Sequence, residues 1–210
     1  MCHGPRSEAL SSFLKSFLSL RLMDYENLLP AEIASALEAI ASDSESVFGP
    51  LDARRLNWRP DAQQWSIAQC FDHLLNANRL MLAAADAALS GAAPRTIWRR
   101  LPLLPGVFGR ALIRSQSPDG RKKYTAPLQA RPSAGDLAPD IVRRFVEQQR
   151  EAARKVHLLD SVRAVQTIMT SPFVRVVTYS VLDGWRIVVA HDHRHVEQAK
   201  RVLRCPGFPA

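Results

Sequence analysis

Several features that would place this 210-residue chain in a familiar class are missing from its sequence. It has only three cysteines, Cys2, Cys70 and Cys205, and no Cys-x-x-Cys spacing. An odd number of unpaired cysteines argues against a disulfide-stabilised secreted scaffold and favours a reduced, cytoplasmic protein. No apolar run approaches the ~20 residues that a membrane-spanning helix needs. Residues 1–22 lack the charged start and small-residue cleavage site of a signal peptide.

The common sequence signatures of nucleotide-binding proteins and of serine hydrolases are absent too. The sequence contains no G-x-G-x-x-G, no P-loop and no G-x-S-x-G pattern, and no internal repeat. Hydrophobic residues make up 47% of the chain, which is enough for a sizeable core. They recur with helical spacing in four long segments, residues 30–47, 67–89, 140–157 and 181–203. We therefore predict an all-α four-helix bundle with one long crossover.

Acidic residues are scarce between the second and third predicted helices. Between Pro94 and Tyr124 the only acidic residue is Asp119. Eight residues in the same segment are basic: Arg95, Arg99, Arg100, Arg110, Arg114, Arg121, Lys122 and Lys123. This segment carries most of the formal net charge of +8. It could bind an anionic partner, but it has no recognisable nucleic-acid-binding pattern, so a solvated loop is the preferred interpretation.

Proline and composition divide the chain into regions. Prolines recur from about residue 92 to residue 136, so we expect a basic insertion into the bundle that covers one of its ends. Residues 1–27 are expected to form an N-terminal extension that is at most loosely ordered. Residues 28–204 should form the bundle, and residues 205–210 a tail.

The segment Val181 to Leu203 holds two histidines where apolar residues are expected. His191 and His195 lie one turn apart in the apolar stripe, whereas His193 should face solvent. Two buried imidazoles need partners, and a shared metal ion would satisfy both. Hydrogen-bonded core histidines are the alternative. His73 lies on one shoulder of the helix 67–89, either facing a groove between helices or half exposed, while Asp72 should point to solvent.

Two motifs resemble those of the DinB-like (DinB/YfiT) superfamily. They are W-S-I-A-Q-C-F-D-H-L, from Trp65 to Leu74, and H-D-H-R-H-V-E-Q, from His191 to Gln198. Proteins of this type are four-helix bundles that hold a divalent metal with three histidines. The resemblance implies that His73, His191 and His195 are the metal ligands. Three imidazoles suit zinc, nickel or iron, and leave a coordination position open for a substrate.

Activity is implied by the resemblance alone. Characterised relatives include metal-dependent transferases that use a low-molecular-weight thiol such as bacillithiol, mycothiol or glutathione, so a transferase with a small-molecule substrate is the leading expectation. Arg99, Arg100, Arg110 and Arg114 would then be candidates to bind the carboxylates of the thiol. A metal-dependent hydrolase and a non-catalytic, metal-stabilised structural or stress-associated module remain as alternatives. No catalytic residue is assigned, and a homodimer is expected by resemblance.

Overall fold

Four long helices carry the fold, as the sequence predicts. The computed structural model describes residues 23–93, 98, 104–118 and 125–209. The long helices are α2 (Pro30–Phe48), α4 (Ile67–Leu89), α6 (Ile141–His157) and α8 (Val181–Leu203). Their bounds agree with the predicted segments to within about one residue, the usual precision of helix ends. The predicted all-α bundle is confirmed, with one short addition, a two-stranded antiparallel sheet of β1 (Ile168–Thr170) and β2 (Thr178–Ser180).

Local capping explains why these helices begin where they do. At the start of α4 the Ser66 hydroxyl accepts a hydrogen bond from the Gln69 N–H, and the Gln69 side chain accepts one from the Ser66 N–H, both at 3.1 Å. This reciprocal pair is a capping box, and it satisfies two backbone donors that a helix start leaves open. At the start of α8 the Ser180 hydroxyl accepts from the Asp183 N–H at 3.0 Å. The two helices with candidate ligands therefore have well-defined first turns.

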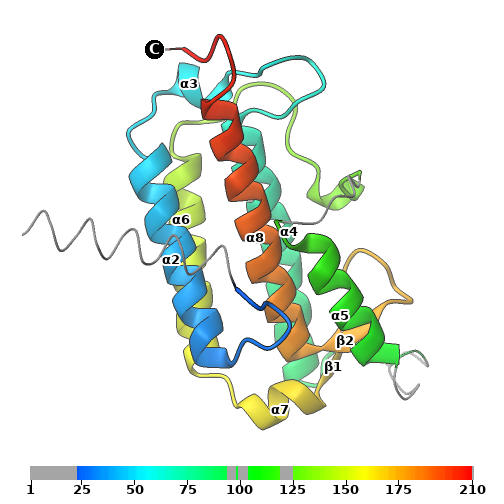
Figure 1. The fold of residues 1–210 in the computed structure, drawn as a ribbon. Coiled ribbons are helices and arrows are strands. Elements are labelled where there is room, and N and C mark those ends of the chain that lie inside the picture. Colours follow the sequence, from blue (N-terminus) through cyan, green and yellow to red (C-terminus); the bar gives the residue numbers. More distant parts are fainter. Residues whose placement is uncertain (1–22, 94–97, 99–103, 119–124, 210) are drawn as a thin grey trace, which may run out of the picture.

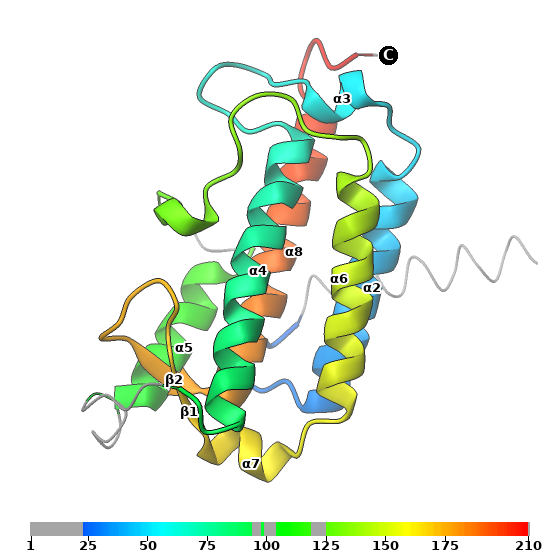
Figure 2. The ribbon, with the colours of Figure 1, turned by 180° about the vertical axis from the view of Figure 1, so that it is seen from behind.

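The four helices surround one core. Helix α2 packs against α6 and α8, and α4 packs against α8 and α6. Helices α4 and α6 run in one direction, while α2 and α8 run in the other (Figures 1 and 2). The chain must therefore return along the whole bundle between α4 and α6, which is the single long crossover that the sequence predicts. Each helix contributes a stripe of buried apolar side chains, such as Ile33, Phe71, Phe145 and Val188.

The crossover lies along the side of the bundle rather than only over one end, which corrects the expected position. Its helix α5 (Leu104–Gln116) packs against α8 and β2, and its short 3-10 helix η2 (Leu128–Ala130) packs against α4. Gly109 permits the close approach of α5, since a Cβ atom there would lie 2.6 Å from an Asp183 carboxylate oxygen. Six of the eight basic residues lie outside the described residues, namely Arg95, Arg99, Arg100, Arg121, Lys122 and Lys123.

Smaller elements close the two ends of the bundle. Helix α3 (Ala53–Asn57) lies between α2 and α4, and α7 (Ser161–Gln166) lies between α6 and β1. The T-shaped ring pair of Trp58 and Phe208 fastens the C-terminal residues beside α3. Residues 1–22 of the predicted N-terminal extension lie outside the described residues. Across the part of the chain that the structure describes, no helix combines the length and apolar character needed to cross a membrane.

Two polar residues predicted to face solvent are buried. His193 is only 5% exposed and is hydrogen-bonded through Nδ1 to the Tyr25 hydroxyl. Asp72 is 8% exposed, and its carboxylate accepts a hydrogen bond from the Ser133 N–H at 2.7 Å. The predictions were wrong because a simple amphipathic pattern assumes one buried face. Helix α8 is instead covered by α2, α4 and α5, and α4 is also covered by η2.

Candidate metal centre

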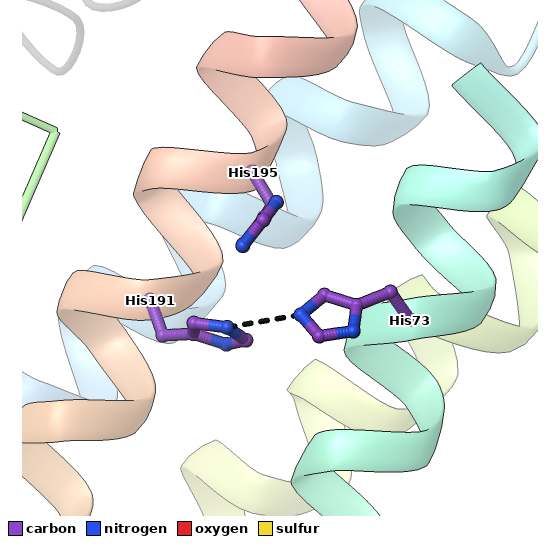
Figure 3. Close-up of side chains that lie close together, drawn as sticks. All are labelled: His73, His191 and His195. Carbon is purple, nitrogen blue, oxygen red and sulfur yellow. Dashed lines mark hydrogen bonds between the residues drawn. The ribbon is translucent and has the colours of Figure 1, made fainter. Parts of the chain in front are cut away.

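Three histidine side chains from two helices converge near one point. His73 comes from the second turn of α4, and His191 and His195 come from successive turns of α8. One ring nitrogen from each lies within 4.8 Å of the others. Figure 3 shows the two α8 imidazoles directed toward the ring from α4. The structure therefore brings together all three histidines that the sequence motifs single out, and these could hold a metal ion.

The spacing of the nitrogens fits metal coordination. The Nε2 atoms of His73 and His191 are 3.1 Å apart. Zinc–nitrogen bonds of about 2.0–2.1 Å at a tetrahedral angle place two ligand nitrogens about 3.3 Å apart. The ring centroids of His191 and His195 are 4.6 Å apart, as expected for side chains at positions i and i+4 of one helix. The three potential ligand atoms lie within 4.8 Å of one another, so they are close enough to share an ion.

A backbone carbonyl fixes the orientation of the candidate ligand His73 on α4. The Nδ1–H of His73 donates a hydrogen bond to the carbonyl oxygen of Ala130 in η2. Since a neutral imidazole carries one N–H, this bond leaves the lone pair on Nε2, the atom that faces His191. Metal-binding histidines commonly donate their other nitrogen in this way. No sequence pattern indicates this partner, because a backbone carbonyl carries no side-chain signal.

Burial keeps all three imidazoles in the form that binds metal. Burial lowers the pKa of His73, and the hydrogen bond to Ala130 opposes that effect only in part. Burial, then the neighbouring His195 and His73, hold the pKa of His191 well below its usual range. Burial, followed by His73 and Arg194, lowers the pKa of His195 to about 3. Metal binding requires neutral imidazoles, and near pH 7 these groups are neutral.

One nitrogen of the third ring lacks a hydrogen-bond partner among the described residues. The Nδ1 atom of His195 is buried and forms no hydrogen bond with the described residues. A buried polar atom left in this state costs free energy. Coordination of an ion through Nδ1 itself would offset that cost, so this atom is compatible with a metal ligand.

The Trp65 side chain packs against two of the three rings. The Trp65 ring stacks on His195 at a centroid distance of 5.8 Å and lies 5.0 Å from that of His73. Trp65 belongs to the first motif, but its contact with both histidines could not be predicted from the sequence. Arg194 of α8 donates to the carbonyl oxygens of Ser115, at 2.8 Å, and Ser117, at 3.3 Å, and thus connects α8 to the end of α5.

No fourth protein ligand joins this group within the described residues. The cluster of potential ligands consists of the three histidines and contains no cysteine or carboxylate. Cys70 lies one turn before His73, but burial raises the pKa of its thiol to about 12, so it is not a thiolate near pH 7. Because zinc prefers four ligands in such sites, a three-histidine set leaves one position open.

Two of the four arginines proposed to bind an anionic partner are among the described residues. Arg99 and Arg100 lie outside the described residues. Arg114 of α5 forms an ion pair with Glu26, and Arg110 is exposed. Arg194 was not among the candidates, yet its positive charge is close enough to lower the pKa of both His191 and His195.

The chain was also compared with known protein families, curated proteins and solved structures. A family model described as the DinB superfamily matches residues 36–199. This range includes both motifs and all three histidines. No match was found among curated proteins, and none among solved structures.

Proposed function

The chain belongs to the DinB superfamily, and we propose that it binds one divalent transition metal through His73, His191 and His195 and acts as a transferase that uses a low-molecular-weight thiol. The observation that carries this proposal is the convergence of three neutral imidazoles without a fourth ligand among the described residues. Three neutral ligands leave the full charge of the ion in place. When bound, the ion would supply Lewis acidity that makes a thiol at the open position a thiolate nucleophile near neutral pH.

The protein's own residues would orient and select the reactants. The hydrogen bond from His73 to Ala130 holds one ligand ring in place, and Trp65 packs on the ring of His195. Trp65 would exclude water from that side. The positive charge of Arg194 beside the ligands would favour a thiol or substrate that carries an anionic group.

A thiol nucleophile suits this site better than a water nucleophile. Hydrolysis usually draws on a general base close to the attacking water. The two carboxylates next to the ligands in sequence are both committed to other partners, Asp72 to the Ser133 N–H and Asp192 to the Asn78 amide. A thiol that is already a thiolate needs no such base in the attacking step.

The test is a transfer assay on the metal-loaded protein. Glutathione, bacillithiol and mycothiol would each be offered with an electrophilic substrate, and loss of free thiol would be measured. We expect turnover that requires both metal and one of the thiols and that disappears in His191→Ala. His157→Ala, at an exposed position in the last turn of α6, is the matched control.

Either of two other results would refute the proposed transferase activity. Metal-dependent cleavage of an ester or amide without any thiol would identify a hydrolase. Stoichiometric metal without turnover of either kind would identify a metal-stabilised structural module.

A further inference from the structure

A second pair of side chains ties together the same two helices that carry the histidines. The carboxylate of Asp192 on α8 is completely buried, and Asn78 on α4 is 1% exposed. The Asn78 side-chain amide donates to both carboxylate oxygens of Asp192, at 3.0 and 3.1 Å. We refer to these two residues as the Asn78–Asp192 pair.

The pair lies next to the candidate metal ligands on both helices. On α8, Asp192 directly follows His191, so their side chains project about 100° apart around the helix. On α4, Asn78 lies five positions after His73, or about 7.5 Å along the helix axis at 1.5 Å per residue. Any sliding of α8 against α4 would break the pair and would also move His191 and His195 away from His73.

The pair adds a polar constraint to the apolar contacts of α8. The buried apolar side chains of this helix include five valines together with Leu182, Trp185 and Ile187. A shift of α8 by one turn, about 5.4 Å, would separate the Asn78 amide from the Asp192 carboxylate. A bidentate hydrogen-bonded pair has one geometry, and a buried polar pair of this kind can specify register even where it adds little stability.

Burial makes such a pair costly to keep. The Asp192 carboxylate is completely removed from water, and the Asn78 amide donates to it. An apolar pair of the same volume would avoid this desolvation and is often as stable or more stable. The distinctive property of this polar pair is therefore its defined geometry rather than a gain in stability.

We propose that the Asn78–Asp192 pair is a positioning element that sets the register of α8 against α4 and so aligns His191 and His195 with His73. The proposal rests on the metal centre proposed above. It makes Asn78 and Asp192 positioning residues and not ligands, since neither belongs to the cluster of potential ligands.

The chain offers a matched control on the same helix. Lys200 of α8 is 6% exposed and forms an ion pair with Asp43 of α2 at 2.7 Å. This pair is also buried and also joins α8 to another long helix, but it does not join α8 to α4. Asp43→Asn should therefore lower stability without moving the histidines relative to one another.

The test compares metal affinity and metal geometry with stability. For wild type, Asn78→Ala and Asp43→Asn, we would measure the zinc dissociation constant by competition with a chelator. The visible absorption of the cobalt(II)-loaded proteins would report ligand geometry, and urea unfolding in EDTA would report stability. Asn78→Ala should bind zinc at least about tenfold more weakly, the usual effect of losing a supporting contact, and should change the cobalt spectrum. Asp43→Asn should lower only the urea midpoint.

If Asn78→Ala does not fold, a double variant that exchanges the two residues tests the proposal instead. The double variant Asn78→Asp with Asp192→Asn restores an amide–carboxylate pair in the opposite direction, and should recover both stability and zinc affinity. The proposal is overturned if Asn78→Ala keeps wild-type affinity and spectrum, or if the reversed pair recovers stability but not affinity. A wild-type protein that binds neither zinc nor cobalt would instead refute the metal centre itself.

Discussion

Metal binding should raise the thermal stability of this protein, because the three histidines lie close together only in the folded state. His73 and His191 are 118 positions apart in sequence but have nitrogens 3.1 Å apart in the fold. The unfolded chain brings them together only rarely, so an ion that uses all three histidines binds the folded state preferentially. Ligand binding of this kind stabilises the folded state by mass action.

The size of the effect follows from the metal concentration. At a free metal concentration of 100 times the dissociation constant, the stabilisation is about 2.7 kcal/mol. For a chain of this length each kcal/mol raises the melting temperature by about 2–4 °C. The expected increase is therefore about 5–10 °C above the metal-free protein.

The assay is thermal unfolding followed by circular dichroism. The protein would first be stripped with a chelator, and then melted with and without zinc, nickel or iron(II). His191→Ala should lose the metal-dependent increase, whereas His157→Ala should retain it. An equal increase in both variants would contradict the argument, because it would locate the stabilising ion outside the three-histidine cluster.

Three further predictions follow from buried groups elsewhere in the chain. Tyr25→Phe removes the hydrogen bond to His193, and should lower the free energy of unfolding by about 1–3 kcal/mol in a urea titration; an unchanged midpoint would refute it. Burial raises the pKa of Cys70 to about 12, so iodoacetamide at pH 8 should modify half-buried Cys205 in the native protein but Cys70 only after unfolding, as read by mass spectrometry. In metal-free protein the pKa of His195 is lowered to about 3, below the value of 6.5 expected when unfolded, so its contribution to stability is complete above pH 6.5 and is lost as the pH falls toward 3. A urea midpoint no lower at pH 5 than at pH 7.5 would contradict this.

The helices could be predicted from sequence because their signals are local. Pro30 at the first position of α2, Ser66 before α4 and Ser180 before α8 each act within one turn of chain. The apolar spacing that follows them extends over several turns. Such signals depend little on the rest of the fold, and so the predicted bounds agree with the structure.

The supporting contacts of the site could not be predicted because they depend on the packing of distant segments. Ala130 supports His73 through a backbone carbonyl, which no sequence pattern marks. His193 was predicted to be exposed, and it is buried because Tyr25, from the segment before α2, packs on a second side of α8. His191 and His195 were identified as candidate ligands from their helical spacing, whereas His73 was identified through the two family motifs, since periodicity alone left it undecided.

The most direct test of the central claim is elemental analysis of the untagged protein, purified without chelator or added metal. The account predicts about one zinc, nickel or iron per chain, as a single three-histidine site would hold, with none retained by His191→Ala or His195→Ala. A wild-type protein that carries no such metal and takes up none on titration would contradict it, and would make His73, His191 and His195 ordinary residues of a helical core.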